Sequence, residues 1–165
     1  MTSARIVEVG SDRLDEIEPI WLLLKGHHVD MDDPELAPIR AQRQTWNGRR
    51  AGFERILRGD GFLFLAEVDD HAVGYVIVEV LDGAGNWRIA GNRYANLESI
   101  AVLPDFRGGG VGAELMARAY DRLRERGIEE VVTQVVIGNE AARRFYERDG
   151  LRAWTVNYLG RVPPA

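Results

Sequence analysis

Apolar residues follow two spacings along the chain, and together these spacings predict a mixed α/β fold. Runs that are apolar throughout or at every second position predict strands. They cover 5–9, 62–68, 72–81, 94–103, 131–137 and 153–159. Apolar residues three or four apart predict helices, one following an N-cap at Ser11 and others over 39–57, 110–126 and 139–149. The resulting order, β-α-α-β-β-β-α-β-α-β, predicts one mixed sheet with helices on both faces, within a single domain covering residues 1–165.

Turn and cap residues support these boundaries. Asp69-Asp70 separates two apolar runs and predicts a tight hairpin. Gly127 follows the third predicted helix and is expected to end it, and Asn139 is expected to cap the fourth. Residues 27–38 contain acidic residues, histidines and two prolines, so they are expected to form a loop.

Composition narrows the class of protein. The chain has 165 residues, of which 45% are hydrophobic and 28% charged, as in ordinary soluble domains. Its net charge of −5 argues against sequence-independent binding of nucleic acid. There is no cysteine, which excludes disulfides, thiolate catalysis and cysteine-based zinc sites. No apolar run approaches the ~20 residues that span a bilayer, and the start lacks a signal-peptide core, so we expect a cytoplasmic protein without membrane contact.

One acidic, histidine-containing segment resembles a metal site at first sight. His27 and His28 precede Asp30, but adjacent histidines on a helix point about 100° apart and chelate poorly. We therefore expect no metal.

A glycine-rich stretch carries the main chemical signal. A predicted strand ends at Leu103, and Gly108-Gly109-Gly110 then opens a predicted helix. Unpaired N–H groups at the positive end of a helix dipole are a seat for phosphate oxygens. A dinucleotide site is excluded because four residues separate the strand from the first glycine and no acidic residue ends the next strand. A phosphate-loop NTPase is excluded because no Gly-Lys-Ser/Thr follows.

Two motifs make this signal more specific. Arg107-x-x-Gly110-x-Gly112, between a strand and an amphipathic helix, resembles motif A of the GNAT N-acetyltransferase superfamily. The stretch 132–151, with Asn139 and Tyr146, resembles motif B of the same family. The resemblance implies a mostly antiparallel central sheet, acetyl-CoA as co-substrate, direct transfer of acetyl to the primary amine of a small molecule, and a possible homodimer. Two alternatives remain open: a non-catalytic acyl-CoA-binding or sensing domain, and an N-terminal acetyltransferase acting on peptides or proteins.

The resemblance also implies where the cofactor lies. The loop backbone would hold its pyrophosphate through Arg107, Gly108, Gly109, Gly110, Val111, Gly112 and Ala113. The pantetheine arm would pair with the strand at Ile100, Ala101 and Val102, where the N–H near Val102 polarises the thioester carbonyl. Asn139 would add a contact to the same arm.

Two residues are candidates for moving protons. By resemblance Tyr146 protonates the departing thiolate, because a phenol with a pKa near ~10 is protonated at neutral pH. Glu98 interrupts an apolar strand, is expected by alternation to share a face with Ile100 and Val102, and is the candidate base. Some relatives place a glutamate where this chain has Gln134, which cannot act as a base.

The second predicted helix carries a basic edge that includes Arg49 and Arg50. We expect this edge to face solvent.

Overall fold

The computed structural model describes residues 4–31, 44–83 and 91–158. Within them a five-stranded sheet has the order β1-β2-β3-β4-β5. The strands are β1 (Arg5–Val9), β2 (Phe62–Val68), β3 (His71–Asp82), β4 (Arg93–Val102) and β5 (Val131–Thr133). The first four strands pair antiparallel and β5 pairs parallel with β4, which confirms the mixed, mostly antiparallel sheet.

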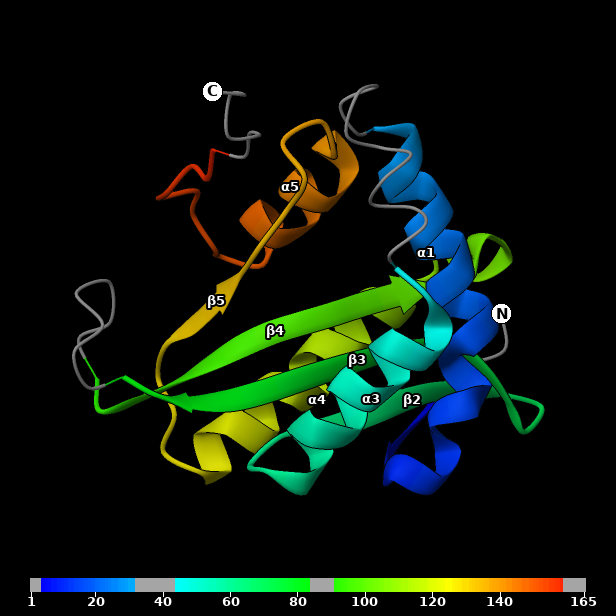
Figure 1. Ribbon diagram of the computed structural model, residues 1–165, viewed down its shortest axis with the longest axis horizontal. Coiled ribbons are helices and arrows are strands. Elements are labelled where there is room, and N and C mark those ends of the chain that lie inside the picture. Colours follow the sequence, from blue (N-terminus) through cyan, green and yellow to red (C-terminus); the bar gives the residue numbers. More distant parts are fainter. Residues whose placement is uncertain (1–3, 32–43, 84–90, 159–165) are drawn as a thin grey trace, which may run out of the picture.

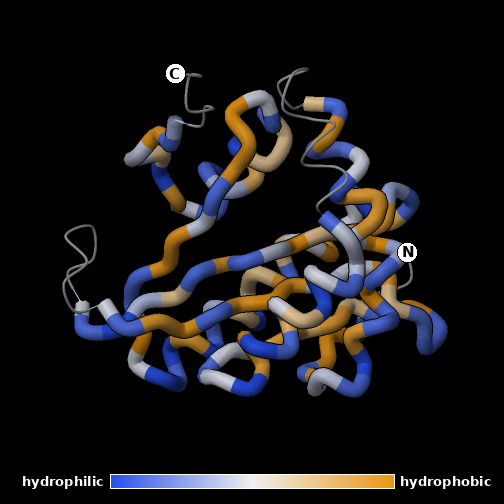
Figure 2. Tube along the Cα trace, in the orientation of Figure 1, coloured by the Kyte–Doolittle hydropathy of each residue, from blue (hydrophilic) through white to orange (hydrophobic). Residues whose placement is uncertain are grey.

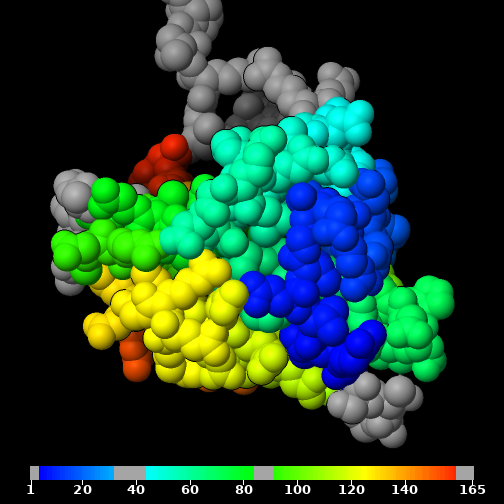
Figure 3. Space-filling model, turned by 90° about the horizontal axis from the view of Figure 1, so that it is seen from below, coloured from blue at the N-terminus to red at the C-terminus, as the bar shows by residue number. Residues whose placement is uncertain are grey.

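Helices cover both faces of this sheet, as predicted (Figures 1 and 3). One face is packed by the 3-10 turn η1 (Ser11–Ile17), α1 (Glu18–Asp30) and α3 (Trp46–Arg58). The other is packed by α4 (Val111–Glu125), which follows the short 3-10 turn η2 (Pro104–Phe106). The helix α5 (Glu140–Arg148) lies beyond β5. Hydrophobic residues are frequent along the central strands between these layers (Figure 2).

Local signals set most of the element boundaries. Asp69 and Asp70 have φ of 50° and 62°, which closes the predicted β2–β3 hairpin with a tight turn whose twist matches the strands. The Asn139 side chain accepts a hydrogen bond from the Ala142 N–H at 3.0 Å and caps α5, as expected. Gly127, at φ of 65°, follows the end of α4. No helix among the described residues is both long and apolar enough to cross a membrane.

The N-terminal helices differ from the prediction. Ser11 begins a 3-10 turn rather than capping an α-helix, because Gly10 occupies the cap position and no side chain caps it. The α-helix starts at Glu18, with Pro19 in its first turn, and it runs to Asp30. Residues 27–30 are therefore helical rather than loop. Residues 32–38 of the predicted loop and 39–43 of the second predicted helix lie outside the described residues.

The C-terminal third also departs from the prediction. The predicted strand over 131–137 is shortened to Val131–Thr133, because β5 pairs with β4 over three residues and then diverges from it (Figure 1). Its side chains are half-buried or exposed rather than densely buried. The predicted strand over 153–159 is absent from the described part, since residues 151–158 form neither helix nor strand. These residues have no neighbouring strand among the described ones to pair with.

Candidate active site

The glycine loop forms an open helix start at the N-terminus of α4. Gly110 is the cap residue at φ of 92°, and no side chain accepts a hydrogen bond from the first turn. Gly108 has φ of 77°, a conformation that side chains other than glycine rarely adopt. The space beside both α-carbons is open. The N–H groups of this turn are therefore available to an anion, and the helix dipole favours negative charge there.

The residues that flank these glycines have different roles. The Arg107 Nε donates a hydrogen bond to the Val102 carbonyl oxygen at 2.8 Å, which ties the loop to the end of β4. Val111 is buried in the core beneath the loop. A Cβ at Gly112 would lie 3.3 Å from the Phe145 ring, so this glycine allows α4 and α5 to approach closely. Gly109 and Ala113 are exposed.

The strand before the loop borders a fork in the sheet. Pairing between β4 and β5 ends at the pair Leu97 and Thr133, and β5 then leaves β4 (Figure 1). Ile100, Ala101 and Val102 continue to pair with β3 on the opposite side and are half-buried. Their edge toward β5 has no strand partner among the described residues. The backbone there is able to pair with an extended ligand in the manner of an added strand.

Tyr146 lies at the point where the two strands part. Its hydroxyl interacts with Thr133, whose own hydroxyl donates to the Leu97 carbonyl oxygen at 3.1 Å. Burial raises the pKa of Tyr146, and the hydrogen bond with Thr133 partly offsets that rise. The phenol therefore keeps its proton at neutral pH. The neighbouring Phe145 packs edge-on against it, with ring centroids 5.3 Å apart.

Glu98 occupies a β-bulge, and this changes the direction of its side chain. Ser99 pairs with Ile77, and Leu97 pairs with Val78, so Glu98 has no opposing residue in β3. The expectation from strict alternation is therefore wrong. Ile100 and Val102 join the core on the α4 side of the sheet, whereas Glu98 bonds to α3 on the other side. An extra residue in one strand shifts the alternation by one position beyond it.

Two polar residues hold the Glu98 carboxylate. The Arg49 Nη1 donates to Glu98 Oε1 at 2.6 Å, and the Asn96 Nδ2 donates to Oε2 at 2.9 Å. The Arg49 guanidinium also stacks 4.5 Å from the centre of the Phe53 ring. The side chains of Arg49 and Glu98 are 31% and 24% exposed, so the pair is half-buried. The prediction that Arg49 faces solvent is wrong, because α3 turns it inward onto β4.

A buried hydroxyl pair lies beside this carboxylate. The Tyr75 hydroxyl is 2.8 Å from the Ser99 Oγ, and the whole Tyr75 side chain is buried. Burial raises the pKa of Tyr75 to about 12. Arg49, Glu98 and Tyr146 all act electrostatically on this phenol. The candidate acid and the candidate base thus belong to one neighbourhood around Tyr75.

Sequence reasoning missed Arg49, Thr133 and Ser99 as parts of this neighbourhood. One signal was present: Arg49 precedes Phe53 by four positions, which places the two on the same face of a helix. Nothing in the local pattern indicates that Thr133 meets Tyr146, since the two residues come together only through the packing of α5 against β5.

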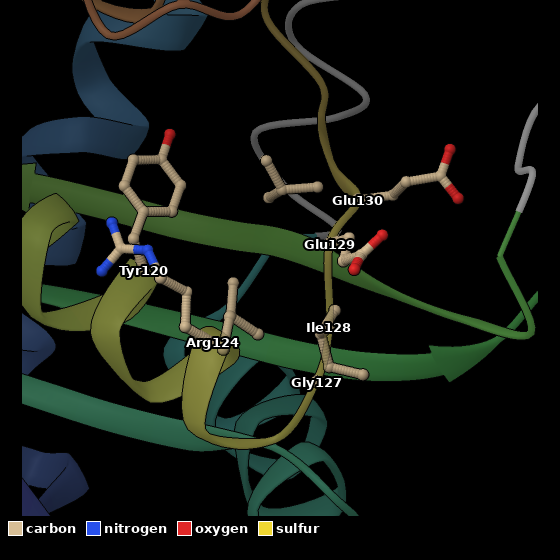
Figure 4. Close-up of a pocket in the computed structure, with 8 residues that line it drawn as sticks. Tyr120, Arg124, Gly127, Ile128, Glu129 and Glu130 are labelled. Atoms are coloured by element: carbon tan, nitrogen blue, oxygen red, sulfur yellow. The ribbon is translucent and has the colours of Figure 1, made fainter.

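A separate hollow of about 390 Å³ lies at the other end of α4 (Figure 4). It lies among Tyr120, Leu123, Arg124, Gly127, Ile128, Glu129, Glu130 and Val131. Burial, and then the neighbouring Asp149 carboxylate, raise the pKa of Tyr120, which lines this hollow. The hollow borders the C-terminal end of α4, whereas the glycine loop opens its N-terminal end, so it is not part of the candidate active site.

Comparison with known proteins places the chain in a family. The profile of the acetyltransferase (GNAT) family matches residues 26–151. The chain belongs to this family. A mycothiol acetyltransferase of Thermobispora bispora is 39% identical over 162 residues, which are 95% of this chain and 48% of that protein. The chain thus spans about half the length of that relative.

Solved structures share the fold. The tetramutant of the BH1408 protein from Bacillus halodurans superposes with a TM-score of 0.78 at 17% identity, covering 96% of this chain and 99% of that one. The aminoglycoside N-acetyltransferase AAC(6')-Iy, solved in complex with CoA, gives a TM-score of 0.68 at 20% identity, with 96% and 100% covered. At sequence identities of 17% and 20%, these similarities show a shared fold and nothing more.

Proposed function

We propose that this protein transfers the acetyl group of acetyl-CoA directly to the primary amine of a small molecule. The observation that carries the proposal is the fork between β4 and β5, which has an uncapped helix start at one end and the protonated Tyr146 phenol at its side. Family membership and the CoA bound to one structural neighbour support acetyl-CoA as co-substrate.

The residues present fit such a co-substrate. The open turn at Gly108 and Gly110 offers N–H groups and a helix dipole to a pyrophosphate. The edge of β4 at Ile100 to Val102 offers backbone groups to the amides of an extended arm. Bound there, the thioester supplies an activated acetyl group. The buried Asn139 lies beyond the fork as the cap of α5, within the second family motif.

The chain's own residues account for the proton movements. The amine nitrogen forms a bond to the acetyl carbon while the carbon–sulfur bond breaks. Tyr146 supplies a proton to the departing sulfur, because its raised pKa keeps the phenol neutral until that moment. Glu98 accepts the proton that the amine loses, and Arg49 and Asn96 hold its carboxylate in place. In sum, one proton leaves the amine and one arrives on CoA.

The direct test replaces Tyr146 by phenylalanine. We expect kcat to fall by about 10²-fold with little change in KM for acetyl-CoA, because a positioned acid contributes about 10²–10⁴-fold. Thiol release with a panel of small amines measures this without background, since the chain has no cysteine. Tyr94→Phe, at the other end of β4, is the matched control and is expected to keep the wild-type kcat.

Two results would count against the proposal. Unchanged turnover in Tyr146→Phe would remove Tyr146 as the acid. Tight binding of acetyl-CoA by the wild-type protein, with no thiol release for any amine, would instead identify a binding or sensing domain.

A further inference from the structure

A single hydroxyl ends the valine run of β5. Thr133 follows Val131 and Val132 and lies at the last pair between β5 and β4. Threonine and valine have nearly the same shape and both favour strands, so the strand itself does not require the hydroxyl. Thr133 is half-buried, where a polar group is costly unless it has hydrogen-bond partners. The partners of this hydroxyl therefore indicate what it does.

Two groups meet the Thr133 hydroxyl. Its Oγ1 donates to the Leu97 carbonyl oxygen at 3.1 Å, and it shares a hydrogen bond with the Tyr146 phenol. A threonine hydroxyl carries one proton and two lone pairs. Because its proton is committed to Leu97, the Thr133 oxygen accepts from Tyr146. The phenol proton is therefore directed at Thr133, at the point where β4 and β5 part.

The same hydroxyl is able to serve the phenolate that the reaction creates. When Tyr146 gives its proton to the departing sulfur, its oxygen gains a negative charge that burial disfavours. Rotation about the Cβ–Oγ1 bond turns the Thr133 proton from the Leu97 carbonyl oxygen to the phenolate oxygen. Hydroxyl protons rotate to suit their acceptors, and a charged acceptor gives the stronger bond. Thr133 keeps its own proton throughout, so the step still moves one proton from Tyr146 to sulfur.

Two other phenols lie close enough to interact electrostatically with Tyr146. They are Tyr75 of β3 and Tyr120 of α4. Burial raises the pKa of both, and the Asp149 carboxylate raises that of Tyr120 further. Neither phenol is charged near neutral pH. The charge state of Tyr146 therefore depends on its own burial and on Thr133.

We propose that Thr133 is the positioning residue of the acid: its hydroxyl accepts the hydrogen bond of the Tyr146 phenol before the transfer and donates one to the phenolate afterwards. This inference rests on the proposed function, in which Tyr146 protonates the departing thiolate. Thr133 forms no bond to the acetyl group or to the amine in this scheme and acts through Tyr146. Its effect on turnover should therefore vanish when residue 146 has no hydroxyl.

Kinetics of two Thr133 variants test the role. Thr133→Val removes the hydroxyl, keeps the shape, and should lower kcat for thiol release by about tenfold, since a hydrogen bond to a charged group contributes at least that factor. The KM for acetyl-CoA should stay within about twofold of the wild-type value, because the effect arises in the transition state. Thr133→Ser restores a hydroxyl and should keep kcat within about threefold of the wild-type value. Added to Tyr146→Phe, Thr133→Val should lower kcat by less than about twofold further, because the two side chains act as a unit.

The titration of Tyr146 gives a readout that a merely structural role would not change. In NMR spectra of protein labelled at the tyrosine Cζ, the signal missing from Tyr146→Phe belongs to Tyr146. Its pKa should be higher in Thr133→Val than in the wild type, because the phenolate loses a hydrogen-bond donor. Thr133→Ser should restore the wild-type pKa.

The outcomes separate this inference from the proposed function. If Tyr146→Phe lowers kcat but Thr133→Val leaves both kcat and the pKa of Tyr146 unchanged, the inference is wrong and the proposed function stands. An equal loss of kcat from Thr133→Val with and without the Tyr146 hydroxyl also overturns the inference, since the threonine would then act independently of the phenol. Unchanged kcat in Tyr146→Phe removes the acid and this inference together.

Discussion

Replacing Tyr75 by phenylalanine should invert the order of stability between neutral and alkaline pH. The phenol is fully buried beside the candidate base, and its hydroxyl pairs with the Ser99 Oγ at 2.8 Å. Removing the hydroxyl deletes this bond and leaves the buried Ser99 without it. We expect Tyr75→Phe to lose about 1 kcal/mol of unfolding free energy at neutral pH.

The alkaline effect has the opposite sign. Burial raises the pKa of Tyr75 to about 12 in the folded state, against about 10 in an unfolded chain. Because the pKa of Tyr75 is higher in the folded state, the neutral phenol stabilises the folded protein. This contribution to the free energy of unfolding is complete below pH 10 and is lost as the pH rises toward about 12. The wild type should therefore lose about 1 kcal/mol by pH 11 and about 2 kcal/mol by pH 12 through this one group. Tyr75→Phe lacks the group, so the two stability curves should cross near about pH 11.

Urea unfolding followed by circular dichroism, from about pH 8 to pH 12, measures both curves. Taking the difference between the two proteins removes the titration of the other tyrosines and of Lys25, the only lysine. Tyr94→Phe, a half-buried tyrosine of β4, is the control and should run parallel to the wild type. A constant difference between wild type and Tyr75→Phe across this range would refute the burial argument.

Two further substitutions test the glycine loop at Gly110 and the ion pair between Arg49 and Glu98. Gly110→Ala forces a side chain to φ of 92° and should raise KM for acetyl-CoA at least fivefold by reshaping the loop. Gly127→Ala imposes a similar strain at the other end of α4 and should leave the KM for acetyl-CoA unchanged. An equal rise of this KM in both variants would contradict the proposal that the glycine loop binds acetyl-CoA. Arg49→Ala releases Glu98 and should lower kcat by about tenfold. Arg50 pairs with Asp15 and Glu54 instead, so Arg50→Ala should keep kcat within about twofold of the wild-type value. A wild-type kcat in Arg49→Ala would show that the ion pair with Glu98 has no role in turnover.

Much of the fold was predictable because its determinants are local. Asp69-Asp70 specifies the β2–β3 hairpin, since both residues tolerate positive φ. Asn139 caps α5 through its own side chain. The glycine loop was predictable for the same reason, because an open helix start needs only glycines followed by an amphipathic helix. These features depend on residues within a few positions of one another.

The candidate site was less predictable, because its parts come from distant elements. Alternation along β4 placed Glu98 on the wrong face, since a bulge depends on the register with β3. The sequence pattern predicts that Arg49 faces solvent. In the structure the packing of α3 against the sheet places its Nη1 2.6 Å from the Glu98 Oε1. Likewise, 153–159 has the pattern of a strand, but a strand needs a neighbour to pair with.

The sequence by itself determined the β2–β3 hairpin turn, the cap of α5, the glycine loop that opens α4, and which family motifs are present. All of these depend on the conformational preferences of neighbouring residues and on short-range hydrogen bonds. The tertiary structure alone decided where β5 leaves β4, which way Glu98 points, and that Arg49 and Asn96 hold it. Those features depend on register and packing between segments as much as 49 positions apart, and no local pattern encodes such a distance.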